Sequence, residues 1–141
     1  MKKSIIIIIT FFALSFKTAE KKQEAENISI ITVIANPEKY HKKTIQIQGY
    51  FTNEKEGTAI YLAKNDFQNS IYKNGIYLYI PDNAMEKFKI EPPYQGYVTI
   101  TGVYNKDKKG SYNFYSGGLE NITQIDRMYK KGSLKDEFNM D

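Results

Sequence analysis

The sequence contains no cysteine, one histidine and one arginine, and these absences exclude several kinds of site. Without cysteine the chain forms no disulfide and carries no lipoprotein-type lipid anchor. His41 alone does not make the usual four-ligand zinc site, and no obvious nucleophile accompanies it. Lysines follow it at 42 and 43, which indicates an exposed corner. We therefore expect neither a metal nor a cofactor.

Motifs for phosphate chemistry are missing as well. No glycine-rich loop of the Walker or dinucleotide type occurs. A nuclease built on a small barrel would need arginines beside carboxylates to hold phosphate, and Arg127 is the only arginine. Glu54 and Glu56 lie two residues apart on a predicted turn, where they either bind a hard cation weakly or keep a loop soluble. We predict that the protein is not an enzyme.

No apolar run reaches the length of a membrane-spanning helix. Residues 5–16 are apolar apart from two hydroxyl side chains, but 12 residues fall short of the roughly 20 that a span requires. Two lysines precede this run, as in a signal peptide. We predict a signal peptide over residues 1–19, cleaved after Ser15 or Ala19, and hence a periplasmic or secreted protein. A retained anchor and a buried N-terminal strand are the alternatives.

A strong charge of one sign is also lacking once this segment is removed. The whole chain has 20 basic and 16 acidic residues, a net charge of +4. Three lysines precede the first acidic residue, Glu20, so the remainder has 17 basic and 16 acidic residues, a net charge of +1. The pI of about 9.0 therefore does not indicate nucleic acid as a partner.

The remaining chain predicts one small β domain. Residues 20–27 are polar and are interpreted as a flexible leader, and residues 28–127 suffice for a single core. Residues 128–141 are charged, have no clear apolar face and are interpreted as a tail. No internal repeat is present.

Alternation of apolar and polar residues predicts the strands. In the first strand, Ile45, Ile47 and Phe51 share one face, and Gly49 leaves a gap in that row where a strand can bend. Gly102 repeats this feature in the fourth strand. The other strands are predicted at residues 58–63, 75–80, 97–104 and 119–125, with an irregular connection over 65–74. The alternation predicts that these residues point inward: Ile60, Leu62, Ile76, Leu78, Ile80, Val98 and Ile100.

Short helices are predicted before and between these strands. Ser29 is a suitable N-cap for a helix whose apolar face is formed by Ile30, Val33 and Ile34. Asn36-Pro37 resets the chain into one further turn over residues 37–40. Another short helix is predicted at residues 83–88, between the third and fourth strands.

The segments TIQIQGYF, IYLYI, YVTITGVYN and GGLENITQI carry a resemblance to the OB-fold in their order. The segment ANPEKYHKKTIQIQGY is similar to the opening of small bacterial domains in which an NPxxY turn precedes a V-x-V-x-G strand. The resemblance covers about 100 of the 141 residues. It implies a mainly β fold: a five-stranded, OB-like Greek-key barrel with an N-terminal helix and a short helix between strands 3 and 4.

Two groups of residues are candidates for ligand binding. Tyr61, Tyr77 and Tyr79 are predicted on the outer face of the second and third strands, which many OB-folds use for oligonucleotides or oligosaccharides. Cross-strand tyrosine pairs that merely stabilise the sheet are the alternative. The second group combines lysines with aromatic residues in the loop before the last strand, where a solvated turn is the alternative: Lys106, Lys108, Lys109, Tyr112, Phe114 and Tyr115.

Three hypotheses follow for the function. The first is an exported, non-enzymatic binding module for an oligosaccharide, a cell-envelope fragment or a protein partner. The second is a protein that binds single-stranded nucleic acid. The third is an interaction protein whose exposed strand edge pairs with another chain.

Overall fold

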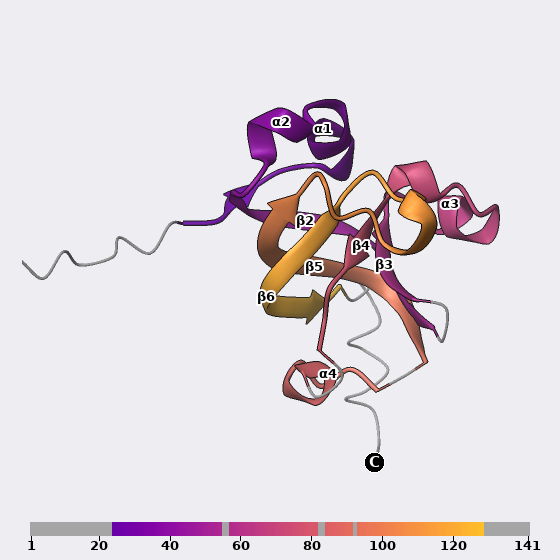
Figure 1. Cartoon of the computed structure of the whole chain (residues 1–141). Coiled ribbons are helices and arrows are strands. Elements are labelled where there is room, and N and C mark those ends of the chain that lie inside the picture. The colour runs from indigo at the N-terminus through magenta and orange to yellow at the C-terminus, as the bar shows by residue number, and fades with distance from the viewer. Residues whose placement is uncertain (1–23, 55–56, 82–83, 92, 129–141) are drawn as a thin grey trace, which may run out of the picture.

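The strand β2 (Thr44–Glu54) pairs along both of its edges (Figure 1). The computed structural model describes residues 24–54, 57–81, 84–91 and 93–128. Along one edge β2 pairs with β5 (Tyr94–Asn105) over ten residues, and along the other its last five residues pair with β3 (Gly57–Tyr61). The strand therefore belongs to both halves of the sheet.

The remaining strands close the sheet into a five-stranded barrel. β3 pairs antiparallel with β4 (Gly75–Leu78), β4 pairs parallel with β6 (Gly118–Arg127), and β6 pairs antiparallel with β5. The order β2-β3-β4-β6-β5, closed by the β2–β5 pairing, is compatible with an OB-like fold. The predicted fold class is confirmed.

A sixth strand lies where the sequence predicted a flexible leader. β1 (Glu26–Asn27) pairs in parallel with Ile45 and Gln46 of β2, and Ile28 N donates a hydrogen bond to Gln46 O at 2.9 Å. The prediction of a flexible leader over residues 20–27 is therefore wrong for residues 26–27. Their extended backbone pairs with β2 and satisfies backbone hydrogen-bonding groups along part of the β2 edge. The predicted signal peptide lies outside the described residues.

Helices cover both ends of the barrel (Figure 1). α1 (Ile30–Ala35) is capped as predicted, with Thr32 N donating to Ser29 Oγ at 3.2 Å, and α2 (Pro37–Tyr40) follows directly. At the other end lies α4 (Ala84–Lys87), between β4 and β5. No helix in the described part of the chain combines the length and apolarity that a membrane crossing requires.

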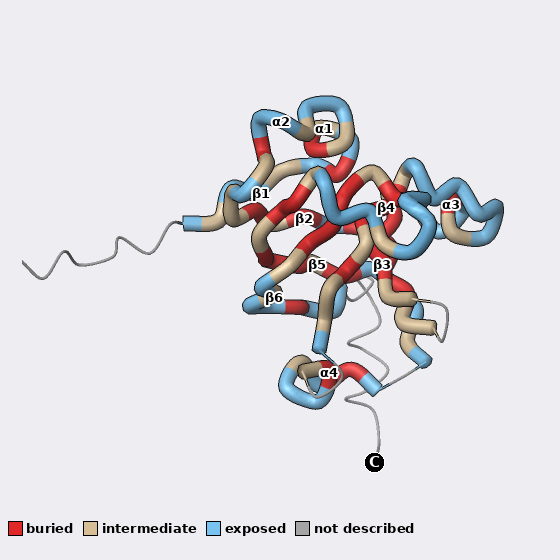
Figure 2. The backbone as a smooth tube through the Cα atoms, viewed as in Figure 1, coloured by how far each residue is buried: buried red, intermediate tan, exposed pale blue. Residues whose placement is uncertain are grey.

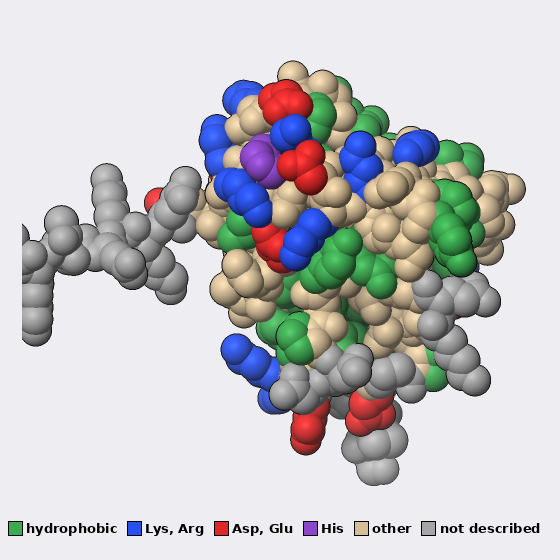
Figure 3. All heavy atoms as spheres, in the orientation of Figure 1, with side chains coloured by type: hydrophobic (Ala, Val, Ile, Leu, Met, Phe, Trp, Pro, Cys, Tyr) green, Lys and Arg blue, Asp and Glu red, His purple; other side chains and the backbone are tan. Residues whose placement is uncertain are grey.

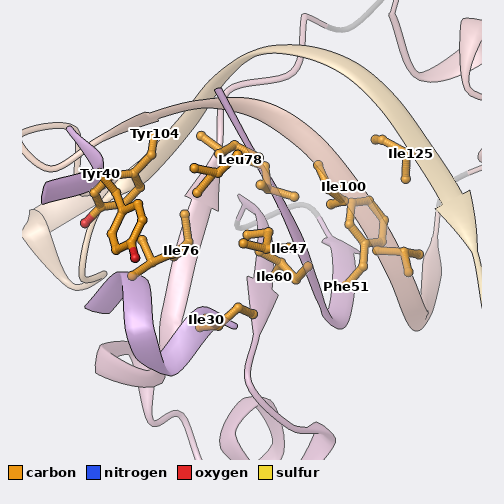
Figure 4. Close-up of a cluster of buried hydrophobic side chains, with 14 of the residues drawn as sticks. Ile30, Tyr40, Ile47, Phe51, Ile60, Ile76, Leu78, Ile100, Tyr104 and Ile125 are labelled. Carbon is orange, nitrogen blue, oxygen red and sulfur yellow. The ribbon is translucent and has the colours of Figure 1, made fainter. Parts of the chain in front are cut away.

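The core fills the barrel with aliphatic and aromatic side chains (Figure 4). Figure 2 shows the buried residues following the strands, whereas the helices are exposed on their outer sides. Two of the residues predicted to point inward, Leu62 and Ile80, are partly buried against the core. The others are each no more than 2% exposed: Ile45, Ile47, Phe51, Ile60, Ile76, Leu78, Val98 and Ile100. Burying each aliphatic side chain contributes about 1.5 to 3 kcal/mol.

The predicted irregular connection between β3 and β4 contains two helical segments, α3 (Lys64–Gln68) and the 3-10 helix η1 (Tyr72–Asn74). Asp66 organises both. Its carboxylate accepts hydrogen bonds from Ala63 N at 3.0 Å and from Asn74 Nδ2 at 2.9 Å. The prediction of an irregular segment is wrong here because the capping residue Ala63 gives no signal in the sequence.

Gly49 allows β2 to approach its neighbours closely. A Cβ atom there would lie 2.6 Å from Ile30 Cδ1 and 2.9 Å from Ile60 Cγ1, and would also collide with the Tyr61 carbonyl oxygen. Gly102 lies at the register shift between β5 and β6. Both glycines were predicted as bend positions. A side chain does not fit at Gly49, and at Gly102 a Cβ atom would lie 3.0 Å from the Glu120 carbonyl oxygen.

We expect Gly49→Ala to lower the free energy of unfolding by about 1 to 3 kcal/mol, because the new methyl group overpacks a rigid junction. Gly96→Ala is the matched control on β5, since its Cβ would meet only the hydroxyl end of the Tyr94 side chain, at 2.7 Å. Urea denaturation of both variants measures the difference. Equal stability of the two variants would contradict the role assigned to Gly49.

Candidate functional site

Two connections cover the outer face of β3 and β4. They are the α3–η1 connection and the loop between β5 and β6, which contains the 3-10 helix η2 (Ser111–Asn113). Between them lies a second, smaller apolar cluster in which Ala59, Tyr61 and Tyr115 are buried and Phe67 and Tyr77 are partly buried. The outer face, which was predicted to be open to solvent, is thus partly covered by these two connections.

Tyr61 is not exposed, and this part of the prediction is wrong. It points away from Ile60, as the alternation of the strand requires, but only 2% of it is accessible. The Phe67 and Tyr115 rings pack against it, with ring centroids 5.6 and 6.0 Å away. Strand alternation defines the face of a residue but not what covers that face.

The hydroxyl groups of Tyr61, on β3, and Tyr115, in the loop between β5 and β6, link the strand to the loop that covers it. Their oxygens are 3.1 Å apart. Burial, together with the hydrogen bond to Tyr115, raises the pKa of Tyr61. Burial also raises the pKa of Tyr115. Both phenols therefore stay neutral and act as hydrogen-bonding groups.

A cavity of about 550 Å³ opens beside this cluster. Its aromatic walls are formed by Tyr61, Phe67, Tyr72, Tyr77, Tyr112, Phe114 and Tyr115. Its polar groups come from Thr52, Glu54, Gln68, Ser70 and Ser111. This size lies within the range of about 300 to 1,000 Å³ that is usual for small-molecule sites.

The rim of the cavity presents three exposed aromatic rings. Tyr112 is 86% exposed, Phe114 47% and Tyr72 36%. The Tyr72 and Phe114 rings are stacked, with centroids 5.3 Å apart, and Tyr112 lies 5.5 Å from Phe114. Large apolar groups at a surface mark sites of interaction when they are contiguous.

The backbone that presents this rim is held in an unfavourable conformation. Tyr112 and Asn113 are consecutive non-glycine residues with φ of 56°. Lys73 supports them, since its Nζ donates to Asn113 O at 3.1 Å, and Ser116 Oγ donates to Lys73 O at 2.6 Å. Such positions cost on the order of 1 kcal/mol or more and persist where the surroundings fix them.

The predicted lysines do not line the cavity with the aromatic residues of their loop. Lys106 Nζ lies 3.2 Å from carboxylate oxygens of both Glu38 and Asp107. Lys108 Nζ lies 2.7 Å from Glu120 Oε2 and 4.9 Å from the centroid of the Tyr79 ring. Figure 3 shows charged side chains of both signs gathered over the region of α1 and α2, with further basic side chains nearer the apolar surface beside α3.

Of the nine predicted residues, the cavity therefore brings together Tyr61, Tyr77, Tyr112, Phe114 and Tyr115. Tyr79 and the three lysines lie outside its lining. Tyr79 is half-buried and accepts a hydrogen bond from Gly110 N at 3.2 Å, which fixes the loop. Lys109 is exposed, and its carbonyl accepts a hydrogen bond from Tyr115 N at 3.2 Å.

Sequence reasoning missed the residues that the α3–η1 connection contributes. Phe67, Gln68, Ser70 and Tyr72 all line the cavity. The available signal was the pair of aromatic residues in a stretch between two strands, since a solvated loop does not need them. Because that stretch was interpreted as irregular, its side chains were not placed.

Glu120 anchors the base of the η2 loop. It accepts hydrogen bonds from Lys42 Nζ at 2.9 Å and Asn105 Nδ2 at 3.1 Å, in addition to its ion pair with Lys108. Lys108 and Lys42 lower the pKa of Glu120 to about 2. Nearby, Lys106 N donates to His41 Nδ1 at 3.3 Å, so His41 is a half-buried loop support and not the exposed corner that was predicted.

In the ranges that the structure describes, no group of three or more histidine, aspartate or glutamate side chains is placed to hold a metal ion. Glu56, the second carboxylate of the predicted weak cation site, lies outside those ranges. Comparison of the chain with protein-family models, with curated proteins and with solved structures gives no match.

We expect Glu120→Gln to lower the free energy of unfolding by about 1 kcal/mol at neutral pH, since it removes two ion pairs to partly exposed lysines. The folded-state pKa is depressed from 4.5 to about 2. The wild-type advantage is therefore full above pH 4.5 and declines as the pH falls toward 2.

Denaturation of both proteins across this pH range measures the effect. Glu86→Gln, on the exposed side of α4, serves as the control and should match the wild type throughout. A difference for Glu120→Gln that does not change with pH would contradict the ionised anchor.

Proposed function

We propose that this protein is an exported, non-enzymatic OB-fold module that binds an oligosaccharide in the aromatic cavity. One observation carries the proposal: seven aromatic rings and several neutral polar groups converge on a single hollow over β3 and β4. OB-folds bind oligonucleotides and oligosaccharides on this side of the barrel. The binding module was the leading hypothesis from the sequence, and the cavity supports its saccharide form.

Saccharide chemistry suits this lining. A sugar ring has C–H groups on its faces, which pack against the flat faces of aromatic side chains, and hydroxyl groups at its edges. Gln68, Ser70 and Ser111 offer hydrogen-bond donors and acceptors for those edges, and the aromatic rim offers the faces. Tyrosine can make both a stacking contact and a hydrogen bond, because it has an apolar ring and a polar hydroxyl group.

The hypothesis that the ligand is a single-stranded nucleic acid has less support. Binding a phosphate backbone requires lysine or arginine beside the stacking rings. Among the described residues that line the cavity, no side chain is basic. Lys106 and Lys108 form ion pairs with acidic residues elsewhere. The hypothesis of pairing through a strand edge is also less favoured, since β2 pairs along both edges and the barrel is closed.

The proposal that the module is not an enzyme rests on the same lining. Its titratable groups in the described residues are tyrosines and one carboxylate, Glu54. General acid–base catalysis on a sugar uses a pair of carboxylates flanking the bond to be cleaved. A single carboxylate suits recognition.

We expect Tyr112→Ala and Phe114→Ala to weaken saccharide binding by about tenfold each, since a stacking contact contributes on the order of 1 to 3 kcal/mol. Tyr97→Ala is the control, because Tyr97 is a 45% exposed tyrosine on β5 that does not line the cavity. Titration calorimetry with soluble tetrasaccharides of glucose and of N-acetylglucosamine measures the affinities.

Oligo-dT of similar length tests the competing ligand. Saccharide binding should be nearly constant between about 50 and 200 mM salt, whereas binding through phosphates weakens steeply over that range. The proposal is overturned if neither tetrasaccharide binds, or if oligo-dT binds more tightly with a steep salt dependence.

Export has its own test. We expect the mature protein from its native source to begin at Phe16 or Glu20, because signal peptidase cleaves after small residues such as Ser15 and Ala19. Mass spectrometry of the intact protein measures its N-terminus. Recovery of a chain that begins at Met1 would contradict cleavage and favour a retained segment.

A further inference from the structure

The cavity contains one charged group among its described lining residues, Glu54. Glu54 ends β2 and is half-buried. Gln95 Nε2 donates a hydrogen bond to one of its carboxylate oxygens, Oε1. In the described part of the chain, the ion pairs of lysine, arginine and histidine are made with other acidic residues, namely Glu38, Asp107 and Glu120. The negative charge of Glu54 is therefore not balanced by an ion pair within this part of the protein.

Aromatic rings lie next to this carboxylate. Glu54 pairs with Gly57 in the β2–β3 ladder. The Tyr77 ring covers Gly57 so closely that a Cβ atom there would lie 3.0 Å from Tyr77 Cε2. The negative charge of Glu54 also contributes to the rise in the pKa of Tyr61. The faces of aromatic rings are electron-rich and attract cations.

A carboxylate and several aromatic faces around one hollow make a site for a positively charged group. Each element favours a cation independently: the carboxylate by charge and hydrogen bonding, and the rings by their quadrupoles. A phosphate or a sugar acid would instead be repelled by Glu54. The ligand class that satisfies both the stacking rim and this charge is a sugar that carries an amine.

We propose that the cavity prefers saccharides with a free, protonated amino group, such as hexosamine oligomers without N-acetyl groups. This inference rests on the proposed function and names its ligand class. The ammonium group donates hydrogen bonds to the Glu54 carboxylate, and the sugar ring stacks on the aromatic rim. An N-acetylated sugar keeps the stacking contact but loses the charge.

Titration calorimetry compares the glucosamine tetramer with the N-acetylglucosamine tetramer at about pH 6, where amines are largely protonated. We expect the tetramer with free amines to bind about tenfold more tightly. Glu54→Gln should abolish this preference by lowering the affinity for the tetramer with free amines to that for the acetylated tetramer. Its amide oxygen still accepts a hydrogen bond, so the contact with Gln95 can be kept.

Glu86→Gln provides the matched control, since it removes the same charge from the exposed side of α4. The control should retain the full preference. If it loses the preference as well, general attraction of a polycation explains the result and the inference is overturned. The same holds if Glu54→Gln weakens both tetramers equally, because Glu54 then acts only as a structural partner of Gln95.

The failure of this inference is distinguishable from that of the proposed function. Equal affinity of the wild type for both tetramers overturns the amine preference but leaves saccharide binding in place. Failure of the wild type to bind either tetramer overturns both.

Discussion

The barrel depends on the close approach of β2 to two partners at Gly49. Here the strand leaves its pairing with β5 alone and begins to pair with β3 as well, and Tyr61, Ile60 and Ile30 all lie within the space of one missing methyl group. Without this approach, the halves of the sheet would not share a strand and the core would have no common wall. The helix α1 depends on the same point, because Ile30 packs against Gly49.

The cavity depends in turn on what the closed barrel places over its outer face. β3 and β4 pair directly, and the pairing of β4 with β6 brings the loop before β6 beside the connection between them, so that both lie above these strands. The hydrogen bond between the Tyr61 and Tyr115 hydroxyls links strand to loop across the base of the cavity. The rim rings then extend outward from Tyr115 through Tyr72 and Phe114. A site of this kind requires no single long element, only two short connections that meet.

The sequence predicted the parts of this arrangement that depend on periodicity. Alternation predicted that Ile47, Ile60 and Ile100 lie in the core, and the N-cap at Ser29 predicted the start of α1. Both signals depend only on residues that are close together in the sequence. Tyr61 shows the limit of the method. The face of β3 on which it lies was predicted correctly. Its burial depends on Phe67 and Tyr115, and no local sequence pattern specifies that these two residues pack against it.

The loop between β5 and β6 shows a second limit. Its lysines and aromatic residues are neighbours in sequence and were expected to form one binding surface, but the aromatic residues line the cavity and the lysines do not. Between them the backbone turns through left-handed conformations at Tyr112 and Asn113. Tyrosine rarely adopts this conformation, so the identity of Tyr112 does not predict it. The fold class was therefore accessible from the sequence, and the composition of the site was accessible only in part.

The same separation explains the electrostatic character of the cavity. Glu120 and Glu38 bind the loop lysines on the side of α2 and β6, which stabilises the loop and at the same time keeps those cations out of the cavity lining. The loop is thus anchored by charge at its base and presents aromatic rings at its tip. A protein that used these lysines to hold phosphate would have to leave them without acidic partners. Here the partners come from two other elements of the fold, so these positive charges support the structure. Among the described residues that line the cavity, the one charged group is the carboxylate of Glu54.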